Sequence, residues 1–429
     1  MRPVKIHVPE GSILNCKYPA ACGAGPRIGN VLVSTVCEAV AKMIYASGRY
    51  DDVNASTTGN LEFVGGPGYF YGGHTREGIA VAQGLYDIHG SGMGAAPRRD
   101  GVNTGGHMNI PSAGISDVER IEMQYPFLYF TRSHNPDGSG FGQYRGGLGS
   151  HRIYLIYGSN DCSVDYKPYG GVAQGGFGLA GGFPTGVGAT RVIIEAGLEM
   201  LDKVRAGQHP TAAAMRAGEW GKSFLPTSVP ERIPLPEGSL LVDYVAGGGG
   251  FGDPIEREPD AVLQDFGRGW VSREVAERTY GVILSTSGKA VDDAATKRQR
   301  EEIRNERKQK SAPPSAREDD LSQNSWRSLL KFHAALEIAT DGKRRVLRCA
   351  RCGHVFCRAE ENYKRFALHR IMHLSEIMPP LASGDPYIGE YHFYSCPGCA
   401  TQLQVDMFSP PLGGDPVLWD TRIDADRLN

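Results

Sequence analysis

The sequence contains 429 residues, with a formal net charge of −2 and a pI of about 6.6. A nearly neutral chain of this length predicts two or three domains and disfavours a protein that binds nucleic acids or membrane surfaces. No apolar run reaches the roughly 18 residues of a membrane span and the N-terminus has no apolar signal region, so we expect a cytoplasmic protein.

The first half of the chain predicts a β-rich structure with few helices. Alternating apolar residues at 4–8 indicate a strand, and apolar residues at helical spacing predict a helix at 30–47. Residues 191–206 predict a second helix, which ends at Gly207. Short strands between glycine-rich turns are expected from residue 59 to 190, for example at 61–64, 127–130 and 152–157.

A run of glycines follows the next predicted strand. Residues 240–244 lead into residues 247–254, whose sequence is Gly-Gly-Gly-Gly-Phe-Gly-Asp-Pro. No Lys-Ser/Thr pair follows, so this is not a Walker phosphate loop, and we interpret it as close backbone packing at the end of a strand. Two short helices are expected next, one at about 259–266 and one from the N-cap Ser272 to Gly281.

The composition of the chain changes near residue 286. Most of the 57 glycines precede this point, and the residues beyond it are poor in glycine and rich in charge. Residues 297–310 carry seven basic and three acidic side chains with hardly any apolar ones, so we expect a solvated helix or linker rather than a DNA-binding arm. We therefore predict a body at 1–285, a charged and polar linker at 286–324 and a C-terminal domain at 325–429.

Four cysteines of the C-terminal domain have the spacing of a metal site. Cys349 and Cys352 form one Cys-x-x-Cys unit, and Cys396 and Cys399 form a second. Two such turns predict a tetrahedral, four-sulfur zinc site, which is structural because it leaves no open position for a substrate. Reduced cysteines on neighbouring hairpins and a redox-active pair are the alternatives.

Other metal donors lie close to these cysteines in the sequence. Cys357 or His354 can replace one of the four ligands. His369 and His373 are four residues apart on a predicted helix, where they would either bind a second metal or belong to an ordinary helix surface.

The body contains residues suited to ligand binding. Glycines let backbone N–H groups approach an anion or a cofactor closely. We assign the candidate cofactor-binding positions to Gly90, Gly92 and Gly94. Arg145, in a turn-rich segment, is suited either to a bound carboxylate or phosphate or to a structural ion pair.

The segment downstream of these glycines is the candidate catalytic region. A histidine near carboxylates serves acid–base chemistry or metal binding. The candidate catalytic residues are His107, Asn109 and Glu122. The alternative is that the carboxylates of this segment, which include Asp117 and Glu119, are solvated surface groups.

Several of these segments, in order and spacing, resemble the C-terminal half of the hydantoinase B family. That family includes the matching subunits of acetone and acetophenone carboxylases. The resemblance extends over roughly residues 2–285. It is carried by residues 2–4 with 9–15, 90–95, 144–147, the glycine run 247–254 and the two short helices that end at 280–282.

The C-terminal domain is similar to a second family. Residues 325–425 resemble the small, zinc-containing gamma subunit of acetone carboxylase, and residues 413–420 resemble the ending of that subunit. The presence of both resemblances in one chain favours the ketone carboxylase branch over the hydantoin-hydrolysing branch, because the gamma-like subunit accompanies carboxylases.

These resemblances imply a fold and a function. They imply an α+β protein with a β-rich, glycine-heavy body, a few helices and a small C-terminal zinc ribbon. They also imply a subunit of an ATP-dependent, biotin-independent ketone carboxylase, which converts a ketone and bicarbonate to a 3-oxo acid. The alternatives are a subunit of a hydantoinase- or oxoprolinase-type cyclic amide hydrolase and a non-catalytic zinc-bearing scaffold.

The resemblance further implies partner chains. The upstream half of the hydantoinase B family carries a His/Asp-rich metal motif that has no counterpart in this sequence. We therefore expect one partner to supply that half and a hydantoinase A-like subunit to bind ATP, with Mg or Mn in the partner subunits and no biotin.

Overall fold

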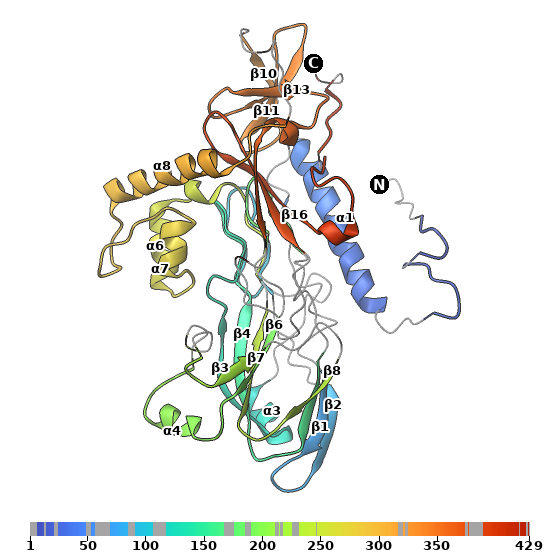
Figure 1. The fold of residues 1–429 in the computed structure, drawn as a ribbon, viewed down its shortest axis with the longest axis vertical. Coiled ribbons are helices and arrows are strands. Elements are labelled where there is room, and N and C mark those ends of the chain that lie inside the picture. The colour runs from blue at the N-terminus through green and yellow to red at the C-terminus, as the bar shows by residue number, and fades with distance from the viewer. Residues whose placement is uncertain are drawn as a thin grey trace.

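The computed structural model has a β-rich body and a smaller C-terminal β-module. Helix α8 (Asp293–Lys310) lies at one side of the molecule (Figure 1). The residues that it describes are 7–12, 14–20, 25–48, 53–55, 69–84, 91–105, 117–166, 176–184, 190–210, 214, 218–224, 231–245, 247–315, 321, 325–373, 376, 389–419, 421–425 and 428. The predicted strand at 61–64 lies outside these residues, as do residues 4–6 of the strand predicted at 4–8. Residues 7 and 8 are described and do not belong to a strand.

A five-stranded antiparallel sheet forms the centre of the body. Its strand order is β3-β4-β9-β6-β7. Every residue of β4 is buried, and its last four residues form a continuous apolar run, as expected for a strand that is covered on both faces. The strands are β3 (Phe127–His134), β4 (Ser150–Ile156), β9 (Ser239–Tyr244), β6 (Thr190–Glu195) and β7 (Lys222–Phe224).

A second antiparallel sheet packs on one face of the first. Tyr154, Ile156 and Leu241 of the central sheet meet Ile233 and Leu235 of the second sheet in one buried cluster. The short helix α3 (Val118–Gln124) adds Ile121 to this cluster. The strands, in spatial order, are β2 (Ala80–Gly84), β1 (Tyr69–His74), β5 (Cys162–Tyr166) and β8 (Glu231–Leu235).

The opposite face of the central sheet is covered by α4 (Met200–Arg205). Met200 and Trp220 pack there against Ile153 and Leu240. The predicted helix at 191–206 is therefore only half correct, because residues 190–195 form β6 and the helix begins at Met200. The β-branched run Val192-Ile193-Ile194 pairs with β9 in the sheet, and this tertiary pairing outweighs the helical spacing.

The other helices of the body follow the predicted signals closely. The predicted helix at 30–47 is confirmed as α1 (Gly25–Ala46), and Gly48 adopts a positive φ of 84° just after it. At the start of α7 (Arg273–Arg278), the Ser272 hydroxyl accepts a hydrogen bond from the Val275 N–H. Helix α6 (Pro259–Gly267) and the 3-10 turn η3 (Pro254–Glu256) also belong to the body.

Beside the central sheet, glycine-rich loops pack backbone against backbone. We call residues 91–105, 138–149, 176–184 and 247–253 the glycine hub. The Gly248 N–H donates to the Gly147 carbonyl at 2.9 Å, and the Gly248 carbonyl accepts from the Gly140 N–H at 2.8 Å. A Cβ on Gly248 would overlap the Met93 carbonyl. The interpretation of the glycine run as close backbone packing is therefore confirmed.

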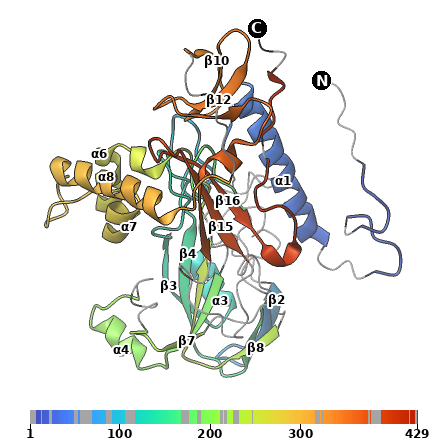
Figure 2. The ribbon, with the colours of Figure 1, turned by 45° about the horizontal axis from the view of Figure 1, so that its top comes forward.

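Helix α8 (Asp293–Lys310) occupies much of the predicted linker and lies beside α6 and α7 (Figures 1 and 2). The Asp292 carboxylate accepts a hydrogen bond from the Ala295 N–H at the start of the helix. Three basic residues occupy the last turn, where positive charge interacts favourably with the negative end of the helix dipole. One face of α8 is not simply solvated. Arg300 donates to the carbonyls of Tyr280 and Arg257, so the helix is fixed to the body by polar contacts.

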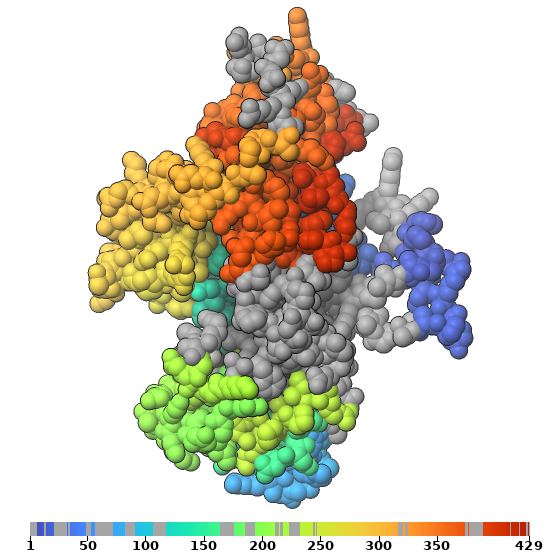
Figure 3. Space-filling view, in the orientation of Figure 1, coloured from blue at the N-terminus to red at the C-terminus, as the bar shows by residue number. Residues whose placement is uncertain are grey.

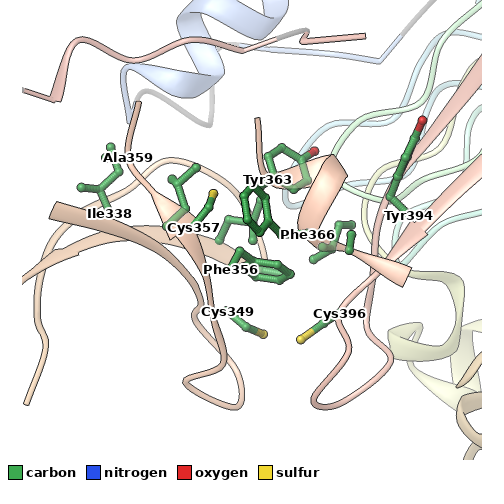
Figure 4. Close-up of a cluster of buried hydrophobic side chains, with 14 of the residues drawn as sticks. Ile338, Cys349, Phe356, Cys357, Ala359, Tyr363, Phe366, Tyr394 and Cys396 are labelled. Carbon is green, nitrogen blue, oxygen red and sulfur yellow. The ribbon is translucent and has the colours of Figure 1, made fainter. Parts of the chain in front are cut away.

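The C-terminal module contains two antiparallel sheets with a shared core. The core includes Leu336, Ile338, Leu347, Phe356 and Leu403, and it extends to Cys349 and Cys396 (Figure 4). In the space-filling view the module lies directly above the body (Figure 3). The first sheet of the module contains β10 (Arg327–Lys331), β11 (Leu336–Thr340), β12 (Arg345–Cys349) and β13 (Val355–Arg358). The second contains β14 (Leu368–His373), β15 (Glu390–Ser395) and β16 (Gln402–Phe408). The 3-10 turns η4 (Tyr363–Phe366) and η6 (Pro410–Leu412) also belong to the module.

The observed architecture confirms the predicted mixture of many strands and few helices with a small cysteine-bearing module. Within the part of the chain that the structure describes, no helix combines the length and apolar character required to cross a membrane.

Candidate metal centre and its docking surface

Two turns of the same design present the four cysteines. Cys349 ends β12 and Cys396 follows β15. In the first turn the Gly353 N–H donates to the Cys349 carbonyl at 2.9 Å, and in the second the Ala400 N–H donates to the Cys396 carbonyl at 2.8 Å. Both Gly353 and Ala400 have positive φ, 76° and 56°. The two turns bring the four thiols together at one place.

The four sulfur atoms lie within 4.8 Å of one another. The Cys349 and Cys399 sulfurs are 3.8 Å apart, and those of Cys352 and Cys396 are 3.7 Å apart. Zn–S bonds of about 2.3 Å at the tetrahedral angle place sulfur atoms about 3.8 Å apart. Figure 4 shows the Cys349 and Cys396 sulfurs pointing toward each other from the two turns. The arrangement therefore fits one tetrahedral zinc ion.

Several thiolates this close together would repel one another unless a cation lies between them. Hydrogen bonding to Cys349 and Cys399, together with burial, raises the pKa of the Cys396 thiol far above its usual range. A divalent cation reverses this preference because it stabilises each thiolate directly. The Thr401 hydroxyl lies 3.1 Å from the Cys399 sulfur and is placed to donate to its thiolate.

The two spare donors do not join the cluster formed by the described residues. Cys357 is fully buried in the module core, where its thiol lies 3.9 Å from the Glu361 carbonyl. The His354 ring contacts the Phe356 ring edge to face, with the ring centroids 5.1 Å apart. The geometry therefore favours the four cysteines over a set that includes either residue.

His369 and His373 do not lie on a helix, so this prediction is wrong. They occupy β14, which pairs in register with β15. A ring nitrogen of His369 lies 3.0 Å from one of His392, and the other nitrogen of His392 lies 3.1 Å from the Glu390 carboxylate. A spacing of four serves one helix face and, equally, one strand face, so spacing alone could not distinguish the two structures.

The module docks on the glycine hub through Asp253, the acidic residue of the glycine run. Its carboxylate is 1% exposed and accepts the Gln402 N–H at 2.8 Å. Arg307 of α8 donates to both carboxylate oxygens, at 2.7 and 2.9 Å, and to the Ala400 carbonyl at 3.1 Å. The Gln402 side chain donates to the Gly181 carbonyl at 2.6 Å. Asp253 thus joins the glycine hub, α8 and the second cysteine turn.

The candidate catalytic and cofactor-binding residues are only partly covered by the structure. His107, Asn109 and Gly90 lie outside the described residues. The Glu122 carboxylate accepts the Tyr129 N–H at 2.7 Å, a contact that fixes α3 to β3. Gly92 and Gly94 are buried in the glycine hub, where a Cβ on Gly92 would overlap the Gly147 carbonyl. Close backbone packing accounts for Gly92 there, and the cofactor-binding role stays a prediction.

Arg145 belongs to a buried structural ion-pair network. Its guanidinium donates to the Asp265 carboxylate at 3.0 and 3.2 Å. The Arg257 guanidinium lies 2.7 Å from the same Asp265 carboxylate and 2.6 Å from the Asp100 carboxylate. Two guanidinium groups and two carboxylates therefore compensate one another, and of the two alternatives for Arg145 the structural ion pair is confirmed.

Sequence reasoning did not identify Asp253 and Arg307 as interface residues. A signal for Arg307 was present, because Arg300, Arg304 and Arg307 recur at the spacing of one helix face. That face carries charge rather than apolar side chains, and it binds carbonyls and carboxylates. Asp253 gave no such signal, since its partners lie about fifty and about one hundred and fifty residues away.

Comparison with known proteins assigns the body to a family. The family model for Hydantoinase B/oxoprolinase matches residues 1–254, more than half of the chain. The chain belongs to the hydantoinase B/oxoprolinase family. A second model, for the acetone carboxylase gamma subunit, matches residues 327–429. This family member therefore carries a gamma-like module after its body, and the predicted resemblance to both families is confirmed.

Several curated proteins are similar to the chain. The acetone carboxylase alpha subunit of Xanthobacter autotrophicus is 26% identical over 313 residues, which are 69% of this chain and 39% of that protein. The acetophenone carboxylase delta subunit of Aromatoleum aromaticum is 26% identical over 73% of this chain and 46% of its own length. The caprolactamase subunit beta of Pseudomonas jessenii is 30% identical over 48% of this chain and 32% of its own.

A solved structure agrees with these relatives. The nucleotide-free structure of acetone carboxylase superimposes with a TM-score of 0.53 and 26% identity, covering 62% of this chain and 36% of that one. The chain spans less than half the length of the curated relatives it matches.

Proposed function

We propose that this chain is one subunit of an ATP-dependent, biotin-independent ketone carboxylase of the acetone or acetophenone type. In this proposal the complex converts a ketone and bicarbonate to a 3-oxo acid, forming a C–C bond. The observation that carries it is that a hydantoinase B-like body and an acetone carboxylase gamma-like module occur in one chain, docked through Asp253, Arg307 and Gln402.

The proposal includes a zinc ion bound by Cys349, Cys352, Cys396 and Cys399. The sulfur separations fit zinc, and all four ligand positions belong to the protein. Such an ion supplies no reactive position and holds the two cysteine turns together. Since Ala400 of the second turn accepts a hydrogen bond from Arg307, the ion also supports the docking surface of the module.

The proposal also requires partner subunits. One partner would supply the upstream half of the hydantoinase B family, and a hydantoinase A-like partner would bind ATP with Mg or Mn. The similarity to subunits of acetone carboxylase and acetophenone carboxylase supports membership of a complex with several subunits. His107, Asn109 and Glu122 remain the proposed catalytic residues of this chain, and Gly90, Gly92 and Gly94 its proposed cofactor-binding residues.

Reconstitution tests this function. The chain is purified together with its co-purifying partners, and ATP hydrolysis is measured with acetone or acetophenone in the presence and absence of bicarbonate. We expect hydrolysis and formation of a 3-oxo acid only when ketone, ATP and bicarbonate are all present. His107→Ala should abolish product formation, whereas the exposed His209, changed to Ala in parallel, should leave it intact.

A cyclic amide hydrolase subunit is the second candidate, favoured by the 30% identity to the caprolactamase subunit beta. The same preparation incubated with caprolactam or a hydantoin distinguishes the two reactions. Ring opening without bicarbonate would support the hydrolase and overturn the carboxylase. Failure of any activity in a complex that retains zinc and all its partners would support the non-catalytic scaffold instead.

A further inference from the structure

A cleft separates the body from the C-terminal module on one side of their contact. Its volume is about 400 Å³, within the range typical of small-molecule sites. One wall belongs to the module and includes Lys331 at the end of β10 and Arg351 inside the first cysteine turn. The facing wall belongs to the body and includes Arg98, Gln143 and Phe251. Neither wall forms a cleft without the other.

The charge of this cleft is positive. Arg98, Lys331 and Arg351 all line it, and none of the residues that line it is acidic. The Arg351 guanidinium lies 2.6 Å from Glu256, which it shares with Arg304 at 3.2 Å, so one carboxylate serves two cations. The Lys331 ammonium group has no acceptor among the described residues. A cleft with this charge attracts anions.

The histidine of the cleft supplies a ring face rather than a charge. The Nδ1 atom of His333 accepts the Ala335 N–H at 3.0 Å, and this leaves Nε2 as the donor to the Leu403 carbonyl at 3.0 Å. Both ring nitrogens are therefore occupied in the neutral form. The His333 ring packs against the Tyr45 ring, which meets Phe251 edge to face with centroids 5.6 Å apart. These three rings give the cleft an aromatic wall.

We propose that this cleft binds a small organic anion, with its phosphate or carboxylate group at Lys331, Arg351 and Arg98 and its apolar part against Tyr45 and Phe251. The inference goes beyond the proposed function, because it holds for either reaction and concerns a site at the contact between the two modules. Since Arg351 lies between Cys349 and Cys352, the bound anion and the metal centre share one turn.

Calorimetric titration of the zinc-loaded full-length chain with phenyl phosphate, at low ionic strength, tests the proposal. Lys331→Met should weaken binding about tenfold, as expected for the loss of one charge-assisted hydrogen bond. The matched control is Lys343→Met, which removes an exposed lysine from the turn between β11 and β12 and should leave the affinity unchanged. Added salt should weaken binding.

Further measurements separate the parts of the site. Inorganic phosphate should bind more weakly than phenyl phosphate, and neutral benzyl alcohol should not compete measurably. Arg98→Met tests the opposite wall, and the zinc content and melting temperature of each variant establish that it is folded. The proposal is overturned if phenyl phosphate binds more weakly than about 10 mM, or if folded Lys331→Met and Arg98→Met proteins both bind it as tightly as the unchanged chain.

Discussion

The glycine hub and the cysteine-bearing module hold their shapes by opposite means. In the hub, backbones meet directly, and what makes the contacts possible is the absence of side chains at positions such as Gly248 and Gly250. In the module, four particular side chains converge at the edge of an apolar core that includes Cys349 and Cys396. An added side chain should therefore destabilise the hub, whereas loss of one cysteine ligand should destabilise the module.

This contrast shows where each region is vulnerable. A buried backbone contact is already hydrogen-bonded, so a new methyl group must displace a neighbouring strand or loop. A metal site is held by bonds that form only when every ligand is present and deprotonated. The following perturbations act on one region or the other, or on the contact between them.

Removal of the metal should have the largest effect, and it should act on the module first. Structural zinc contributes on the order of 10 kcal/mol in small zinc domains. We expect Cys396→Ser or a strong chelator to unfold residues 325–429 while the central sheet of the body stays protected, as measured by hydrogen exchange with mass spectrometry. Cys357→Ala is the matched control, because Cys357 lies in the same core but outside the four-sulfur cluster.

Metal analysis then decides whether the ligands are assigned correctly. The unchanged chain and Cys357→Ala should each bind one zinc ion, and Cys396→Ser should lose it. Full zinc occupancy in Cys396→Ser, or its loss in Cys357→Ala, would show that the ligand set is wrong.

An added methyl group should be the next largest perturbation, and it should act on the glycine hub. Gly248→Ala places a Cβ on the Met93 carbonyl, and we expect a loss of about 3 kcal/mol in the free energy of unfolding, the upper end for overpacking. Gly267→Ala is the control, because no atom lies within 4 Å of the added Cβ. Denaturant unfolding measures both, and equal stability of the two variants would contradict the packing of the hub.

Asp253→Asn should separate the two regions without unfolding either. The change preserves shape but removes the charge that pairs with Arg307, and we expect a loss of about 2 kcal/mol, below the range for a fully buried pair because Arg307 is 14% exposed. Limited proteolysis should cut between α8 and β10 faster than in the unchanged chain. Lys310→Met removes an exposed pair with Glu306 on the same helix and should leave the rate unchanged.

The smallest effect should be a pH dependence within the module. Burial, together with the neighbouring His392, lowers the pKa of His369, so the unfolded chain binds this proton more readily than the folded one. Stability should therefore fall as the pH drops below about 6.5, the ordinary histidine value. His369→Gln should flatten the melting temperature between pH 7 and pH 5, and an unchanged slope would exclude His369 as its source.

Local signals in the sequence predicted local structure well. The cap at Ser272 and the cysteine spacing each involve groups a few residues apart, and the structure confirms the helix start and the convergence of the four thiols. The glycine run was also interpreted correctly, since four consecutive glycines have few uses other than close approach of backbones. The predicted domain boundaries and catalytic residues stay predictions.

The failures arose where distant segments decide the outcome. The first part of the helix predicted at 191–206 is instead strand β6, because it pairs with β9. His369 and His373 likewise lie on a strand rather than a helix, because β14 pairs with β15. The charged face of α8 lacks the apolar stripe by which helices are normally placed. The cleft between the modules was not predictable either, because its walls come from distant segments: Arg98, Gln143 and Phe251 on one side, and Lys331 and Arg351 on the other.

The covalent link through α8 changes what the contact between body and module must achieve. The helix has 18 residues and spans about 27 Å at 1.5 Å per residue. Because α8 is itself fixed to the body through Arg300, only residues 311–326 join it to the module, and a short linker keeps two parts at an effective concentration on the order of millimolar. The contact at Asp253 can therefore be small, polar and weak by the standards of separate chains and still be formed most of the time. Opening and closing of the cleft would then occur within one molecule, at a rate independent of protein concentration.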